Sequence, residues 1–193
     1  MTIIYKLLIS ASIIMTIIAG ISTFIYNDTS WIYTEKGCFE LAQDIVLIFA
    51  FITFLQACFM RGNKQEKYIT IFFTILTYAF ILREIDFERL NLPDWSVILF
   101  HGKGRNITIA IAFATTIILA LREYKHYINQ SFSFILSKRG ILMIIAGTLL
   151  LIGGFLEKRE SLASHEFYEE MFELSGYLVY SASALLTYKK CKK

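Results

Sequence analysis

The amino-acid sequence predicts an all-α protein, a multi-pass helical membrane bundle with six transmembrane helices. Of its 193 residues, 56% are hydrophobic and 18% are charged, whereas soluble domains have roughly 45–50% and about 25%. The apolar residues also form long blocks, and a block of about 18 or more is typical of a transmembrane helix. We expect one integral membrane domain, residues 1–193, with spans at about 3–25, 38–60, 68–86, 107–121, 140–156 and 169–188.

The first block, residues 3–25, is longer than the apolar core of a signal peptide, and no A-x-A cleavage pattern follows it. We therefore interpret it as a retained span. Ser12, Thr16 and Gly20 recur every four residues along it. Small side chains at this spacing let another helix approach closely, so the stripe predicts a helix-packing face.

The second span, 38–60, carries two acidic residues near its start. Glu40 and Asp44 are four residues apart, which places both carboxylates on one face of the helix. Asp44 would lie more than one turn inside the apolar run. Such a position is costly unless the side chain faces a partner or a water-filled cavity.

A stripe of threonines follows one face of the third span, 68–86, and ends at Glu84. Two interpretations are open. The threonine hydroxyls can bond to their own backbone carbonyls, or they can form a polar seam that faces the bundle interior. On a neighbouring face, Arg83 and Asp86 are three residues apart and are spaced to form an ion pair.

An irregular loop, 91–105, leads into the fourth span and ends in the basic residues His101, Lys103 and Arg105. Basic residues and glycines before a helix N-terminus can hold an anion, because free backbone N–H groups and the helix dipole point at it. A phosphate or a lipid headgroup would fit there, and a solvated basic loop is the alternative. A second basic loop, 122–139, carries an apolar patch that we expect to rest on the membrane.

The sixth span, 169–188, begins with a series of glutamates. Glu170 and Glu173 share a helical face with Tyr177 and Tyr180. Acidic residues are favoured at a helix N-terminus by the helix dipole, which is the simplest explanation for them. Glu173 and Asp44 are explained least well in this way, because both should lie below the mouth of the bundle.

With six spans, most of the 19 Lys and Arg residues fall on the side of the termini, and nearly all of the 16 acidic residues fall on the opposite side. Short cytoplasmic loops are rich in Lys and Arg, so we predict that both termini are cytoplasmic and that the protein lies in a plasma (inner) membrane. The net charge of +3 follows from this bias and does not suggest nucleic-acid binding.

The acidic end is therefore the candidate site, with Arg83 as counter-ion to the surrounding carboxylates. The predicted ligand or ion pocket comprises Glu40, Asp44, Arg83, Glu84, Asp86, Glu170 and Glu173. Carboxylates from several helices suit hard cations, including a divalent cation, or can exchange protons. The sequence favours binding or transport of a small ligand or cation. The alternatives are an outer-leaflet lipid hydrolase or transferase that uses these acids with His101 or His165, and an accessory membrane subunit whose partner is the lipid bilayer.

The predicted topology places the loop before the sixth span outside the cell. A Ser161→Cys variant should therefore react with a membrane-impermeant thiol reagent in intact cells. Labelling that requires permeabilised membranes would overturn the topology.

Overall fold

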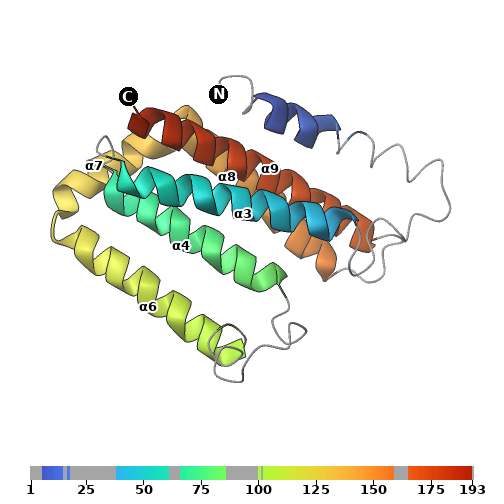
Figure 1. The fold of residues 1–193 in the computed structure, drawn as a ribbon, viewed down its shortest axis with the longest axis horizontal. Helices are drawn as coiled ribbons and strands as arrows, with labels where there is room; N and C mark the ends of the chain where they lie inside the picture. The colour runs from blue at the N-terminus through green and yellow to red at the C-terminus, as the bar shows by residue number, and fades with distance from the viewer. Residues whose placement is uncertain are drawn as a thin grey trace.

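The computed structural model of the protein describes residues 6–14, 17, 38–60, 66–85, 100, 102–158 and 165–192 (Figure 1). These residues are almost entirely helical, and no strand occurs among them. A short helix covers residues 6–14. The longer helices are α3 (Cys38–Phe59), α4 (Lys67–Glu84), α6 (Gly102–Leu121), α7 (Tyr124–Ile135), α8 (Lys138–Glu157) and α9 (His165–Lys192).

Helix α9 is the centre of the bundle. It packs along α8 and α3, while α4 lies against α3 and α6 lies against α4 (Figure 1). Helix α7 links α6 to α8 and packs on both of them. As a result, the first turns of α3 and α9 and the last turn of α4 lie at one end of the bundle.

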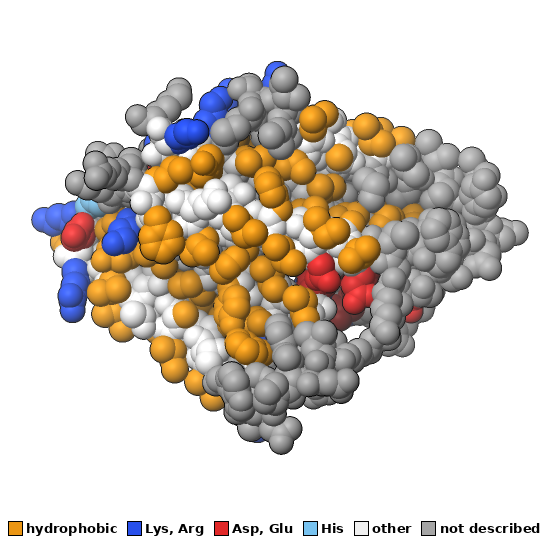
Figure 2. Space-filling view, in the orientation of Figure 1, with side chains coloured by type: hydrophobic (Ala, Val, Ile, Leu, Met, Phe, Trp, Pro, Cys, Tyr) orange, Lys and Arg blue, Asp and Glu red, His pale blue; other side chains and the backbone are white. Residues whose placement is uncertain are grey.

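Polar side chains share the interior of the bundle with an apolar core, which includes Ala50, Phe54 and Val179, while the outer surface is apolar. Hydroxyl groups of α9 are buried, among them those of Ser175, Ser181 and Ser183. Large hydrophobic side chains cover the outer surfaces of α3, α6 and α8, and they dominate the face shown in Figure 2. A water-soluble protein rarely exposes apolar area on this scale, whereas a bilayer solvates it.

Three helices are long and apolar enough to cross a membrane: Phe39–Phe59, Gly102–Leu121 and Lys138–Glu157. They correspond to the second, fourth and fifth predicted spans. The third and sixth predicted spans are the helices α4 and α9, in which charged residues lie at both ends of the apolar sequence. The described chain is thus all-helical and suited to a membrane, and the number of spans stays a prediction.

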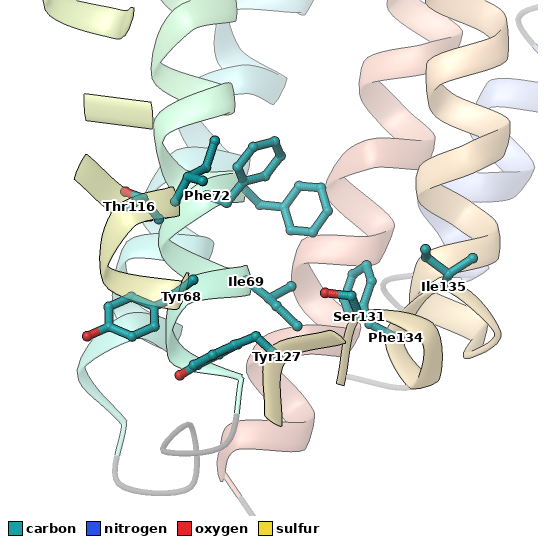
Figure 3. Close-up of a pocket in the computed structure, with 11 residues that line it drawn as sticks. Tyr68, Ile69, Phe72, Thr116, Tyr127, Ser131, Phe134 and Ile135 are labelled. Atoms are coloured by element: carbon teal, nitrogen blue, oxygen red, sulfur yellow. The ribbon is translucent and has the colours of Figure 1, made fainter. Parts of the chain in front are cut away.

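Two predicted loops are wrong in part. The predicted loop 91–105 ends about one turn too late, because α6 already begins at Gly102. Arg105 therefore lies in the first turn of α6, and its Nη1 donates a hydrogen bond of 2.8 Å to the carbonyl oxygen of Leu82. The basic loop 122–139 contains helix α7. Its Tyr127 and Phe134 are two turns apart on one face and pack against rings of α4: Tyr127 lies at a tilt to Tyr68, and Phe134 stacks on Phe73 (Figure 3).

Small residues let α9 approach its neighbours closely. A methyl group added to Gly176 would lie 2.9 Å from Cγ of Leu150 and 3.2 Å from the carbonyl oxygen of Ala146 in α8. Ser12, from the predicted packing stripe, is buried and bonds to the Ser175 carbonyl oxygen at 3.3 Å. The other two stripe residues lie outside the described chain.

The contact at Gly176 predicts that Gly176→Ala pushes α8 and α9 apart and destabilises the protein by about 1–3 kcal/mol, which is typical of overpacking. Gly147→Ala, in α8, is the matched control because its added methyl group meets nothing within 4 Å. We expect the control to be neutral or slightly stabilising in a thermal unfolding assay in detergent. Equal melting temperatures for both variants would contradict the close packing.

Candidate functional site

Acidic side chains of three helices gather where α3 and α9 begin and α4 ends. Figure 2 shows these carboxylates in a recess between apolar surfaces, while the basic side chains in view lie at the other end and along one edge. The residues are Glu40 and Asp44 from α3, Glu84 from α4, and Glu170 and Glu173 from α9. We refer to these five residues with Arg83 as the carboxylate site.

The strongest contact of the site joins α4 to α9. Arg83 Nη2 lies 2.6 Å from Glu173 Oε1, and Arg83 Nε lies 3.8 Å from Glu84 Oε1. The Arg83 side chain is 46% exposed, whereas that of Glu173 is only 3% exposed. The guanidinium therefore reaches from the surface to a carboxylate that would otherwise be buried without a counter-ion, which is strongly unfavourable.

Tyr177 forms a second contact between the same helices. Its hydroxyl donates a hydrogen bond of 2.8 Å to Glu84 Oε1, and the residue is fully buried. The ring of Phe80 packs against it, with centroids 5.6 Å apart. The Tyr177 hydroxyl and the Arg83 guanidinium thus both contact Glu84 and hold its carboxylate in position.

Gln43 connects α3 to the site. Its Nε2 donates to Glu170 Oε2 at 2.7 Å and to the Glu170 carbonyl oxygen at 3.2 Å, and these two acceptors determine the orientation of the amide. The other end of the amide, Oε1, is buried and has no hydrogen-bond partner among the described residues. The same is true of Asp44 Oδ1. Both atoms are acceptors.

The carboxylates act on one another electrostatically. Glu84 is influenced by Glu173 and Asp44, and Glu170 is influenced by Glu173 and Glu84. Arg83 contacts two of them, Glu173 and Glu84. Burying several carboxylates around one guanidinium leaves negative charge that a proton or another cation would offset. No group of three or more His, Cys, Asp or Glu side chains within the described part of the chain is arranged to hold a metal ion.

Most of the predicted pocket residues thus lie at the same end of the bundle. The predicted partner Asp86 and the loop residue His101 lie outside the described chain, as does the side chain of His165. Lys103 is exposed, and Arg105 is engaged with the end of α4, so anion binding there stays a prediction. The predicted pocket omitted Gln43 and Tyr177. Gln43 lies three residues after Glu40 and Tyr177 lies four residues after Glu173, so helical spacing places each of them on the same face as an acidic residue.

The threonines of α4 bond to their own backbone carbonyls and also face the interior of the bundle, so both interpretations of the stripe are correct. Thr70, Thr74 and Thr77 are buried, and each donates to the carbonyl oxygen four residues earlier. The Thr77 hydroxyl also lies 2.8 Å from the hydroxyl of Tyr180 on α9. The seam runs inward along α4 toward the carboxylate site.

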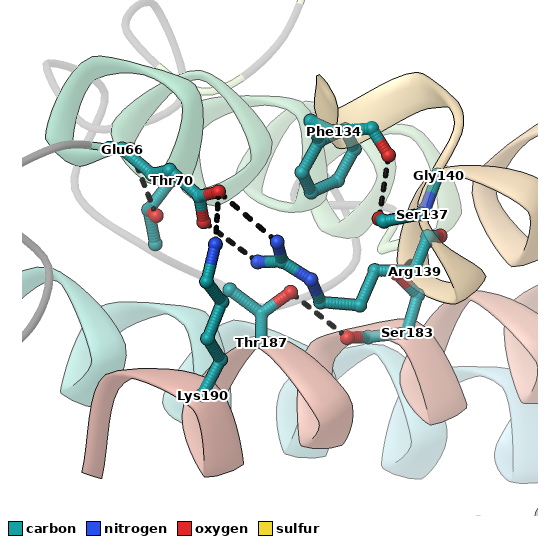
Figure 4. A network of polar contacts seen from close by, with 9 residues as sticks. All are labelled: Glu66, Thr70, Phe134, Ser137, Arg139, Gly140, Ser183, Thr187 and Lys190. Atoms are coloured by element: carbon teal, nitrogen blue, oxygen red, sulfur yellow. Dashed lines mark hydrogen bonds and ion pairs between the residues drawn. The ribbon is translucent and has the colours of Figure 1, made fainter. Parts of the chain in front are cut away.

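A second ionic cluster lies at the opposite end of the bundle, and the sequence did not predict it (Figure 4). Glu66 precedes α4 and accepts two hydrogen bonds from Arg139 of α8, at 2.7 and 3.0 Å. Lys190 of α9 lies 2.5 Å from the same carboxylate. Ser183 donates to the Arg139 carbonyl oxygen at 2.9 Å. The cluster ties the end of α9 to the starts of α4 and α8.

The two cations control the protonation of Glu66. Burial alone would raise the pKa of this carboxyl, but hydrogen bonds and charge from Arg139 and Lys190 outweigh burial and hold the pKa below its ordinary value. Glu66 is therefore ionised at neutral pH and balances Arg139, whose side chain is only 8% exposed.

Comparison with known proteins does not extend this description, since no family model, curated protein or solved structure matches the chain. The class of protein is defined by the helices alone: an all-α protein with three helices that are able to cross a membrane.

The lowered pKa of Glu66 predicts a pH dependence of stability. Because the folded pKa is below the unfolded one, near 4.5, Glu66 contributes fully above about pH 4.5 and loses its contribution as the pH falls through the folded value. Glu66→Gln should cost about 2 kcal/mol at pH 7, and its deficit against the wild type should shrink below pH 4.5. Thermal unfolding at a series of pH values measures this, with Glu123→Gln, an exposed acid at the same end, as control. A deficit that does not change with pH would contradict the prediction.

Proposed function

We propose that this chain is a multi-pass integral membrane protein that binds or transports a small ligand or cation at the carboxylate site. The observation that carries the proposal is the charge of the site: acids from three helices lie at one end of the bundle, and Arg83 contacts two of them, Glu84 and Glu173. An entering cation would supply the positive charge that Arg83 alone does not.

The two buried acceptors without partners support a ligand that donates hydrogen bonds. Gln43 Oε1 is held in the site by the bonds of its own amide nitrogen to Glu170. An unpaired buried acceptor costs about 1–3 kcal/mol, which a donor from the ligand would recover. A small ammonium ion combines positive charge with hydrogen-bond donors and satisfies both requirements.

Arg83 would act as a competing internal cation. Its guanidinium lies on Glu173 and close to Glu84 and is half exposed, so it is able to turn outward when a ligand takes over its carboxylates. Such a site discriminates by charge, because an anion or a neutral molecule cannot replace the guanidinium.

The proposed orientation places this site outward and both termini in the cytoplasm of a plasma (inner) membrane. It is supported by the location of Lys189, Lys190 and Lys192 in the last turn of α9, at the end opposite the carboxylate site. The outer-leaflet enzyme and the accessory subunit stay predictions from the sequence.

The test is a thermal-shift series on the purified protein with methylammonium, K⁺, Mg²⁺ and Ca²⁺ at equal ionic strength. We expect methylammonium to raise the melting temperature of the wild type, since a ligand at 100 times its Kd adds about 2.7 kcal/mol. Asp44→Asn and Gln43→Leu should reduce the shift, while Glu123→Gln at the other end of the bundle should retain it.

A response to a metal ion that Asp44→Asn abolishes would support cation binding and identify the cation as a metal. Flux of the stabilising ion into proteoliposomes would then separate transport from binding. The proposal is overturned if none of the cations stabilises the wild type, or if the shift is the same in Asp44→Asn and Glu123→Gln.

A further inference from the structure

A groove lies between the first turns of α4, the end of α6 and helix α7, far from the carboxylate site (Figure 3). Its volume is about 290 Å³. A second hollow of about 390 Å³ shares Ala120, Tyr127, Ser131 and Ile135 with it, so the two form one continuous track along α6 and α7. We call this track the α7 groove. Its size is comparable to that of small-molecule sites in proteins.

The wall of the α7 groove is suited to a hydrocarbon chain. Phe72, Phe73 and Phe134 form its inner side. The Thr116 hydroxyl already donates to the Ala112 carbonyl oxygen at 2.9 Å and therefore needs no ligand. In Figure 3 the hydroxyls of Tyr68 and Tyr127 point to the same side, at one end of the lining. The groove thus has an apolar body and a polar edge.

The track continues to a basic rim. Tyr124 lines both the second hollow and a polar depression at the corner between α6 and α7, which Arg122, Lys125 and His126 also line. Arg122 and Lys125 are exposed, and the acid in this corner is Glu123. Basic pockets beside membrane helices bind anionic lipid headgroups, since a phosphate accepts charge-assisted hydrogen bonds from such side chains.

The position of α7 indicates where the occupant comes from. The helix follows α6, which is able to cross a membrane, and it has both an inward and an outward apolar face. Ile128, Phe132 and Ile135 are exposed and line the second hollow, so this part of the groove is open to the surroundings. A helix with this pattern lies in the plane of the membrane interface, where acyl chains end and phosphates begin.

We propose that the α7 groove binds one anionic phospholipid from the surrounding bilayer. One acyl chain lies in the groove along Phe72, Ala120 and Ile135, and the phosphate contacts Arg122 and Lys125. The bound lipid fills the space between α4, α6 and α7 and joins α6 to the rest of the bundle. This inference does not depend on the function of the carboxylate site.

The experiment is native mass spectrometry of the full chain, purified in detergent and mixed with phosphatidylglycerol or phosphatidylcholine of the same acyl composition. We expect one phosphatidylglycerol to bind with preference over phosphatidylcholine. Ala120→Phe should abolish binding because the ring fills the groove, whereas Ala110→Phe, on the exposed side of α6, should not. Ser131→Leu narrows the groove more gently and provides a second variant if Ala120→Phe fails to fold.

The headgroup contact is tested separately. Arg122→Gln with Lys125→Gln should raise the Kd for phosphatidylglycerol about fivefold per charge removed, whereas Lys103→Gln with Lys158→Gln, two exposed lysines elsewhere, should leave it unchanged. Equal binding of both lipids, or binding of phosphatidylglycerol that survives both groove variants, would overturn the proposal.

Discussion

The cost of a charge in apolar surroundings governs this structure. Because the outer surface is hydrocarbon-like, every ionic group that enters the bundle needs a partner from another helix. Arg83 meets Glu173 across α4 and α9, and Arg139 meets Glu66 across α8 and the start of α4. The two pairs lie at opposite ends of the bundle, and α4 takes part in both. Together they join α4 to α9 at one end and to α8 at the other.

Between these two ends the bundle is held by small residues and hydroxyls. Gly176 lets α8 and α9 touch, and buried hydroxyls of α9 bond to backbone carbonyls of its neighbours. In a bilayer, lipid tails are as apolar as leucine, so burial of apolar side chains does not drive helices together as it does in water. Close packing and interhelical hydrogen bonds supply that attraction, which explains why the most buried helix is not the most apolar.

Two helices with long apolar runs could be predicted closely. Expected bounds of 38–60 and 140–156 compare with Cys38–Phe59 and Lys138–Glu157, since a long apolar run leaves few alternatives. The partner of Arg83 could not be predicted, because local spacing points to a residue one turn away, whereas Glu173 is 90 residues further along the chain. Helix α7 was missed because its polar residues, among them Lys125, Asn129 and Gln130, resemble those of a loop. The role of its inward rings is clear only from their contacts with α4.

The low hydrophobicity of α9 has a consequence for biogenesis. A helix with several glutamates, serines and lysines partitions poorly into a bilayer by itself, because each of these groups opposes transfer from water. Its hydroxyls and carboxylates find their partners on α3, α4 and α8, all of which are synthesised before it. In the proposed six-span topology, α9 would insert after its neighbours and with their help, and the loss of any one of them would impair its insertion.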